Sequence, residues 1–321
     1  MPEQQHVYFP ISALTILPRT AGRFDLFLKR HDEYVLYCHA GDEFGDETAS
    51  KILDVSEFFV RVDQREEYEQ YLAGNLAGML SDESIPVKER ARVFYNISQT
   101  VVKNVFETRL PRPYTKDTQI RLRNIVKASM HFFTRPEALR NLSQFISRSY
   151  SAYSHSIRVQ VLTTSLLQQY PATPRQSLVE AGMGALLHDI GKKELPREIL
   201  NRPDADCTEE ERELFRTHSL KGVQVCQDME LSRLTNQCIL FHHERLDGRG
   251  YPNGLKSADI PFEVKALSLC DIYDNLTSER PGRPAMSPYK ALEYIKDARK
   301  SAVSQDLFRK LVKMLSSARL I

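Results

Sequence analysis

The stretch Ala185–Lys192, which reads ALLHDIGK, places an imidazole and a carboxylate side by side at the end of an apolar run. Burial of His188 and Asp189 without partners would be costly, and a bound metal ion is the usual remedy. The rest of the chain supplies further residues of the same kind: His155, His218, His242, His243 and Asp271. Every histidine after residue 150 belongs to this set, which predicts a metal site.

The spacing of apolar residues indicates that these ligands point inward. Val159, Leu162 and Leu166 follow His155 at the positions of one helical stripe, so His155 faces the core. Asp271 and its neighbour Asp274 are three apart and share a helix face.

A second apolar face is expected to have His242 at its centre, with His243 about 100° further round. Its other members are Leu231, Leu234, Cys238 and Phe241. Any one inward histidine is usually a satisfied core residue. Five of them with two aspartates, on separate helical faces, favour a metal site of the kind built in helical bundles.

The chemistry of the ligands limits which metals are expected to bind. Imidazole and carboxylate without thiolate suit iron, manganese or zinc, and we expect iron or manganese before zinc. If Asp189 bridges two ions, the seven ligands leave coordination positions for a bridging hydroxide and two phosphate oxygens. Metal-assisted hydrolysis of a phosphoester requires such an arrangement.

The composition is that of an ordinary globular protein, with 41% hydrophobic and 27% charged residues. A formal net charge of +2 gives no reason to expect a nucleic acid polymer as partner. No apolar stretch is long enough to span a membrane and no signal peptide is evident, so we expect a cytoplasmic protein. The five cysteines, none in a C-x-x-C pair, are expected to be reduced core residues, and Cys270 is not expected to bind metal.

Residues 1–75 predict a small α/β regulatory domain without a phosphate-binding loop. Its expected elements are a hairpin of strands at 24–28 and 34–38, a short helix around 49–53 and a strand at 57–62. Residues 76–134 predict a helical linker and residues 135–321 an all-helical domain, so the fold class is mainly α. From about residue 66 onward the chain is expected to hold helices at 68–80, 87–106 and 117–133, interrupted at Pro111–Pro113 and ending before Pro136.

The last domain carries several motifs in order. They are YSAYSHS at 150–156, LHDIGK at 187–192, HSLKG at 218–222, HHERLDGRGYP at 242–252 and DIYDNLTSERP at 271–281. This series resembles the HD-GYP family of the HD phosphohydrolase superfamily, which are bacterial phosphodiesterases for cyclic di-GMP. The resemblance covers residues 135–321 and implies an HD-domain bundle that hydrolyses cyclic di-GMP to pGpG, and further to GMP, through a metal-bridging hydroxide.

The resemblance also implies a division of the ligands. One ion would be held by His155, His188, Asp189 and Asp271, and Asp189 would bridge to a second ion held by His218, His242 and His243.

On the substrate side, Lys192 would neutralise phosphate charge and act with Asp189 in catalysis, while Arg280 and Arg283 would grip phosphate oxygens. Tyr251 would contact the substrate, and Asp274 would orient a ligand or water there. The alternatives are a solvated cation for Lys192, ring packing for Tyr251 and an ordinary surface position for Arg283. Asp247, Gly248 and Gly250 are expected to shape the loop.

Two positions depart from the family pattern. Ser151 stands where members with a third metal carry glutamate, which favours a two-metal centre. Gly282 replaces the tyrosine of an Arg-Pro-Tyr-Arg run. The loss of that tyrosine is expected either to loosen the loop or to remove a packing contact near the substrate, and so to weaken substrate binding.

Two alternatives stay open: the same chemistry on another cyclic dinucleotide or nucleotide phosphoester, and a weakly active cyclic di-GMP sensor or protein-interaction module. The resemblance also points to partners in cyclic di-GMP signalling, such as GGDEF-domain proteins, and to a homodimer.

Overall fold

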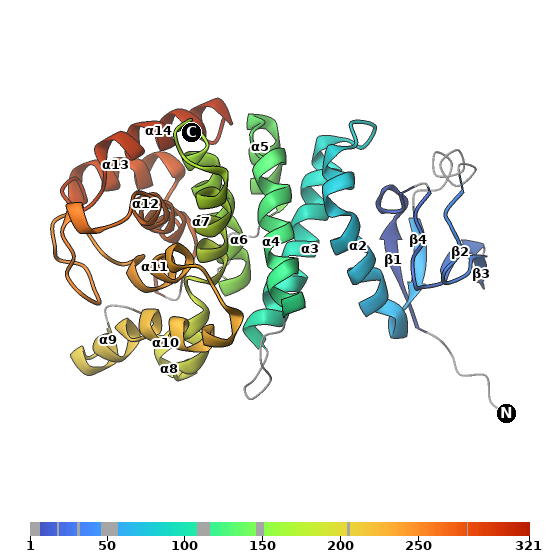
Figure 1. The fold of residues 1–321 in the computed structure, drawn as a ribbon, viewed down its shortest axis with the longest axis horizontal. Coiled ribbons are helices and arrows are strands. Elements are labelled where there is room, and N and C mark those ends of the chain that lie inside the picture. Colours follow the sequence, from blue (N-terminus) through green and yellow to red (C-terminus); the bar gives the residue numbers. More distant parts are fainter. Residues whose placement is uncertain are drawn as a thin grey trace. The chain divides into compact units, whose positions relative to one another are not determined.

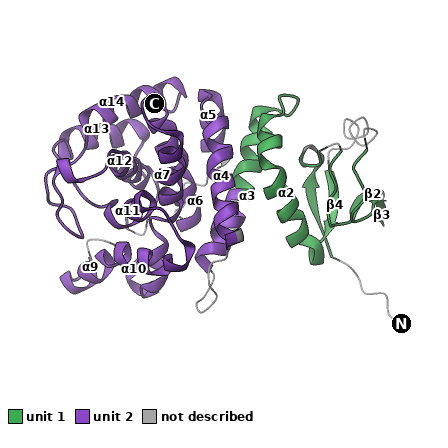
Figure 2. Ribbon diagram, viewed as in Figure 1, with its two compact units in different colours: residues 1–97 green, residues 98–321 purple. Residues whose placement is uncertain are grey.

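The computed structural model describes residues 7–17, 19–30, 33–45, 57–107, 116–145, 151–203, 206–280 and 282–321. The chain divides into two compact units, residues 1–97 and 98–321, with the boundary inside helix α3 (Val87–Glu107) (Figure 2). The helix expected around 49–53 and the break expected at Pro111–Pro113 lie outside the described residues.

The first unit contains an antiparallel sheet of order β1-β4-β2-β3, followed by helix α2 (Figure 1). The elements are β1 (Tyr8–Ser12), β2 (Leu26–Arg30), β3 (Glu33–Cys38), β4 (Glu57–Arg61) and α2 (Arg65–Ser81). The expected hairpin is confirmed, because β2 pairs antiparallel with β3. Its first strand begins two residues later than predicted.

Strand β1 was missed in the sequence. Its central residue, Pro10, has no backbone N–H and interrupts the pattern of strand-forming residues. Pro10 is tolerated because β1 lies at an edge of the sheet, where one side of the strand makes no ladder hydrogen bonds.

The buried face of the sheet follows the two-residue period of a strand. Phe58 and Val60 of β4 are fully buried, while Phe59 between them is half-buried. From α2, Tyr68 and Tyr71 pack edge-on against the buried ring of Phe24, at 5.3 and 5.5 Å between ring centroids. Aromatic residues therefore make up much of this small core.

The secondary-structure elements in the described part of the second unit are helices joined by loops, which confirms the mainly α fold. Its helices after α3 are α4 (Lys116–Phe132), α5 (Pro136–Phe145), α6 (Ala152–Leu167), α7 (Arg175–Leu187), α8 (Arg197–Leu200), α9 (Glu209–Arg216), α10 (His218–Val225), α11 (Arg233–Phe241), α12 (Phe262–Thr277), α13 (Pro288–Ala298) and α14 (Gln305–Ser317). No helix in the described ranges has the length and apolar character needed to cross a bilayer.

Helix α6 lies at the centre of this unit, packed between α7 and α12. It is buried on almost every side, although the apolar stripe alone predicted one buried face. The other sides bury small polar residues such as Thr164, whose hydroxyl donates to the Gln160 carbonyl at 3.0 Å.

The hydroxyl oxygen of Ser151 caps the first turn of α6 by accepting a hydrogen bond from the Ser154 amide. The predicted inward stripe is confirmed, since His155, Val159 and Leu166 are all 0% exposed.

Helix α11 turns a slightly different face to the core than the sequence predicted. Leu231 precedes the helix, and Leu234 is only half-buried. The buried face instead runs through Thr235 and Cys238 to His242. A polar residue fits there because the Thr235 hydroxyl donates to the carbonyl of Glu180, 3.0 Å away.

The start of α10 packs closely on a short 3-10 helix, Ile190–Glu194, that follows the HD pair. A Cβ atom on Gly191 would overlap the carbonyl oxygen of His218 and the amide nitrogen of Gly222. Only a glycine allows the two backbones to approach this closely.

We therefore expect Gly191→Ala to push α10 away from the HD pair and destabilise the protein by roughly 1–3 kcal/mol or more. Thermal unfolding measures this. Gly74→Ala is the control, because a Cβ on that exposed α2 residue meets nothing within 4 Å. The control is expected to be neutral or stabilising by up to about 1 kcal/mol. Equal stability of the two variants would contradict the packing argument.

Candidate metal centre

The structure brings all the predicted metal ligands together in the second unit. They form two groups, within each of which the ligand atoms lie within 4.8 Å of one another: His155 with His188 and Asp271, and Asp189 with His218, His242 and His243. The ligands come from α6 and α12 and from the ends of α7, α10 and α11.

Three of the imidazoles are oriented by carbonyl groups at helix ends. The carbonyls in the last turn of a helix have no partner within it. In each case the ring Nδ1 meets such a carbonyl three residues earlier: His188 with Ala185 at 2.8 Å, His242 with Ile239 at 2.8 Å and His218 with Phe215 at 2.7 Å. Because a carbonyl only accepts, Nδ1 carries the hydrogen, and Nε2 of the neutral ring keeps its lone pair.

The ligand Nε2 atoms face one another in two pairs. Those of His155 and His188 are 3.1 Å apart, and those of His218 and His242 are 3.2 Å apart. Two nitrogens bound to one ion at about 2.1 Å and roughly a right angle lie about 3.0 Å apart. The spacing therefore fits a shared cation in each pair.

Asp189 lies between the two groups. Its Oδ2 is 3.5 Å from Nε2 of His155 and 3.6 Å from that of His188. Its Oδ1 is 3.5 Å from Nε2 of His218 and 3.9 Å from that of His242. One carboxylate oxygen thus faces each group, which is the arrangement of a bridging ligand.

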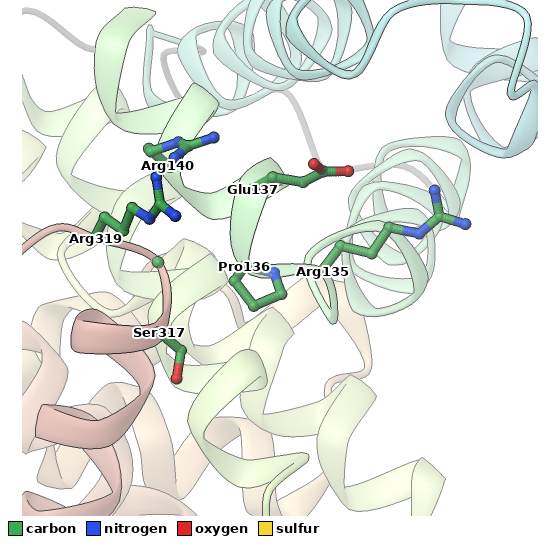
Figure 3. Close-up of a pocket in the computed structure, with 7 residues that line it drawn as sticks. Arg135, Pro136, Glu137, Arg140, Ser317 and Arg319 are labelled. Carbon is green, nitrogen blue, oxygen red and sulfur yellow. The ribbon is translucent and has the colours of Figure 1, made fainter.

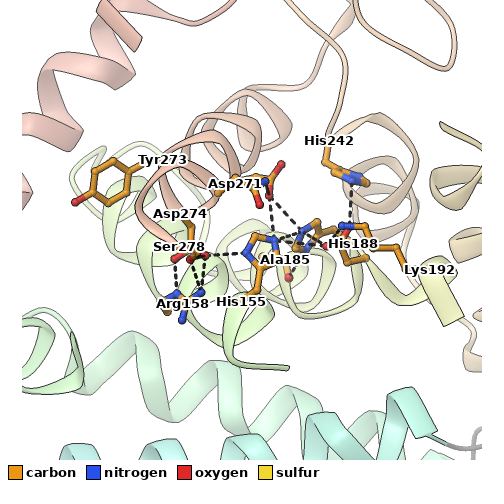
Figure 4. Close-up of polar contacts among 12 residues, drawn as sticks. His155, Arg158, Ala185, His188, Lys192, His242, Asp271, Tyr273, Asp274 and Ser278 are labelled. Atoms are coloured by element: carbon orange, nitrogen blue, oxygen red, sulfur yellow. Dashed lines mark hydrogen bonds and ion pairs between the residues drawn. The ribbon is translucent and has the colours of Figure 1, made fainter. Parts of the chain in front are cut away.

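His155 is held from both sides by aspartates of α12 (Figure 4). Its Nε2 lies 3.1 Å from Oδ1 of Asp271, and its Nδ1 lies 2.7 Å from Oδ2 of Asp274. Asp274 is itself bound by the guanidinium of Arg158. Asp274 therefore orients a predicted ligand rather than facing outward, as expected for carboxylates that support metal-bound histidines.

Burial lowers the pKa of the ligand imidazoles in the second group. The pKa of His218 falls to about 4 through burial and the charge of Lys192, and that of His243 to about 3 through burial and His218. The pKa of His242 also falls well below its ordinary value. These rings are therefore neutral near pH 7, which is the form that binds a metal.

The carboxylates stay charged although they are buried. Burial would raise the pKa of Asp189, but Lys192 and His188 hold it well below its usual value. Burial opposes ionisation of Asp271 too, but His155 and His188 lower its pKa. The pKa of His188 is raised, because the two aspartates outweigh burial. In the second group, neutral imidazoles surround the ionised carboxylate of Asp189, a donor set suited to a divalent cation.

Lys192 contacts the candidate centre directly. Its Nζ lies 2.5 Å from Oδ2 of Asp189, and the side chain is 11% exposed. The ammonium also lies 5.3 Å from the centroid of the Phe215 ring. Lys192 is therefore an ion-paired cation at the edge of the site, and not a solvated cation at the end of a helix.

The predicted phosphate-binding arginines, Arg280 and Arg283, meet at Asn275. Arg280 donates to the Asn275 side-chain oxygen, and Arg283 donates to its backbone carbonyl. The Asn275 amide donates in turn to Oδ1 of Asp271 at 2.8 Å. A chain of hydrogen bonds thus joins both arginines to a predicted metal ligand.

Gly282 lies in a tight turn. The backbones of Arg280 and Arg283 exchange two hydrogen bonds of 2.9 Å, and Gly282 between them has a φ of +72°. A Cβ at this position would lie 2.7 Å from Cβ of Pro203. The glycine therefore fits a close approach to a neighbour, and the expected effect of the missing tyrosine on the loop and on substrate binding stays a prediction.

Tyr251 packs on the second ligand group. Its ring lies 4.6 Å from that of His243, with 32° between the planes. The buried carboxylate of Glu244 holds the following segment by accepting hydrogen bonds from the amides of Asn253 and Leu255 at 2.7 and 2.8 Å. In the same loop Gly248 has a φ of +74°, in line with its expected role in loop shape.

The sequence reading missed several residues that contact the site. Arg158 and Asn275 could have been found, since they lie one helical turn after His155 and Asp271. Phe215 gave no signal, because its carbonyl orients His218 and its ring only meets Lys192 in the folded chain.

A pocket of about 450 Å³ has no metal ligand among its lining residues (Figure 3). It is lined by Arg135, Pro136, Glu137, Arg140, Ser317, Ala318 and Arg319, none of which is a predicted site residue.

Comparisons with known proteins concern the family and the fold of the chain. A family model described as "HD domain" matches residues 123–306. A solved structure of Bd1817, described as an HDG"Y"P protein from Bdellovibrio bacteriovorus, covers 97% of this chain and 100% of that one. The TM-score is 0.67 with 22% identity, which shows the shared fold.

Two curated relatives are similar over about half of the chain. Cyclic di-GMP phosphodiesterase PA4108 of Pseudomonas aeruginosa is 37% identical, over 49% of this chain and 38% of its own length. The 3'3'-cGAMP-specific phosphodiesterase 3 of Vibrio cholerae is 32% identical, over 50% of this chain and 35% of its own length. The matches span less than two thirds of these relatives.

The position of Asp189 leads to a prediction about metal content. Asp189→Ala removes the carboxylate that faces both groups, so we expect loss of both ions, whereas His155→Ala should deplete mainly one. Elemental analysis of protein purified without air measures this. Asp228→Ala, at an exposed aspartate of the same unit, is the control and should keep its metal. Two ions retained by Asp189→Ala would show that Asp189 is not a bridge.

Proposed function

The chain belongs to the HD domain family, and on that basis we propose that residues 135–321 form a metal-dependent phosphodiesterase that hydrolyses cyclic di-GMP. The proposal agrees with the predicted HD-GYP resemblance and with the name of the Pseudomonas aeruginosa relative. The expected product is linear pGpG, with slower formation of GMP, because the opened dinucleotide must bind again in another pose.

One observation carries the proposal: the two oxygens of Asp189 face different imidazole groups. This supports a dinuclear centre in which His155, His188 and Asp271 hold one ion, and His218, His242 and His243 hold the other, with Asp189 shared. Ser151, which caps α6 through its hydroxyl, contributes no carboxylate for a third ion.

The nitrogen and oxygen ligands favour iron or manganese over zinc. When bound, such a pair of ions would polarise the phosphodiester and make water nucleophilic near neutral pH.

The protein side chains then bind and orient the substrate. Lys192, held on Asp189, places a positive charge where the attacked phosphate gains negative charge. Arg280 and Arg283 can release Asn275 to bind phosphate oxygens, because guanidinium groups pair well with phosphate. Asp274 and Arg158 keep His155 in the required orientation.

The domain division belongs to the same proposal: residues 1–75 as a regulatory domain, 76–134 as a helical linker and 135–321 as the catalytic domain. A cytoplasmic location, a homodimer and association with cyclic di-GMP signalling proteins, such as GGDEF-domain proteins, are also proposed.

Another cyclic dinucleotide is the second candidate substrate, since one relative is named as specific for 3'3'-cGAMP. A turnover assay on metal-loaded protein with cyclic di-GMP, 3'3'-cGAMP and cyclic di-AMP tests the proposal, with a chelated sample as control. We expect chelator-sensitive conversion of cyclic di-GMP to pGpG. Cleavage of another phosphoester alone would favour the second candidate, and binding without cleavage would indicate a sensor.

Lys192→Ala should lower kcat roughly 10²-fold while leaving the metal content intact, because its charge acts on the transition state. Arg280→Ala should likewise keep the metal and lose turnover. Lys193→Ala is the control: Lys193 is the next residue, and its charge interacts with Glu194 and Cys226. An unchanged kcat/KM in Lys192→Ala would show that Lys192 takes no part in catalysis.

A further inference from the structure

Tyr251 contacts two groups of different kind, a predicted metal ligand and a cation. Its ring centroid lies 4.6 Å from that of His243, with 32° between the planes. The guanidinium carbon of Arg216 lies over the Tyr251 ring, 6.0 Å from its centroid.

Arg216 is accessible to a ligand. It is the last residue of α9, and its side chain is 48% exposed. Its ion pair with Glu209 uses Nη1 at 3.4 Å, and Glu209 is itself 59% exposed. Such a solvated pair is weak and leaves the other guanidinium donors for a ligand.

Arg216 is poorly placed for the phosphate that is cleaved. Lys192 already contacts Asp189, whereas the contacts of Arg216 are with Glu209 and the Tyr251 ring. The position suits a part of the substrate that extends outward from the phosphate. In a cyclic dinucleotide this part is a base, and bases bind to aromatic rings and arginine planes.

We propose that Arg216 and Tyr251 form a base subsite that selects guanine. This inference rests on the proposed cyclic dinucleotide chemistry. The guanidinium fork donates two parallel hydrogen bonds to O6 and N7 of guanine. Adenine carries an amino donor in place of O6, so it loses one bond and places a donor against the cation.

The test compares Arg216→Ala and Arg216→Lys with the wild type on cyclic di-GMP and cyclic di-AMP. In Arg216→Ala, we expect kcat/KM for cyclic di-GMP to fall roughly 10-fold, mainly through KM, with metal content and kcat/KM for cyclic di-AMP unchanged. Arg216→Lys keeps the charge and can still donate to O6 and N7 but lacks the rigid fork, so it should retain part of the selectivity that Arg216→Ala loses.

Arg212→Ala is a matched control. Arg212 lies one turn earlier on α9, is 43% exposed and pairs with the same Glu209 at 3.4 Å. Arg212→Ala should leave kcat/KM for both substrates unchanged. Equal losses on both substrates in Arg216→Ala, or no loss, would overturn the base subsite.

Binding separates this inference from the proposed function. If the wild type cleaves no dinucleotide, the proposed activity fails, and equilibrium binding of cyclic di-GMP and cyclic di-AMP to the metal-loaded protein then decides. A preference for cyclic di-GMP that Arg216→Ala abolishes supports the subsite, and equal binding of both in the wild type overturns it.

Discussion

A helix leaves its last carbonyls without partners, and in this protein three of those carbonyls orient the candidate metal ligands. Ala185, Phe215 and Ile239 accept from the Nδ1 atoms of His188, His218 and His242. Each hydrogen bond selects the tautomer whose Nε2 lone pair points inward. The places where α7, α9 and α11 end therefore determine where an ion can bind.

Asp189 makes the two groups of imidazoles a single centre. Its carboxylate is 1% exposed, a position that an anion tolerates only when cations and hydrogen-bond donors surround it. Lys192 supplies one positive charge, and the metal ions that we propose would supply the others. The close approach at Gly191 keeps α10, with His218, near this carboxylate.

The ligands could be predicted because each stands out chemically: a charged or imidazole side chain at a core position of an apolar helix. The elements β2, β3 and β4 were predictable from alternation, whereas β1 was hidden by Pro10. The contact of Gly282 with Pro203 and those of the Phe215 and Arg216 side chains join segments far apart in the sequence, so no local pattern predicts them.

X-ray absorption spectroscopy with elemental analysis, on protein purified without air, is the most direct test of the central claim. We predict two ions per chain, with imidazole nitrogens bound to both and a metal–metal distance of about 3.5–4 Å. A single ion, or two ions without a short metal–metal distance, would contradict the assignment of Asp189 as the bridge.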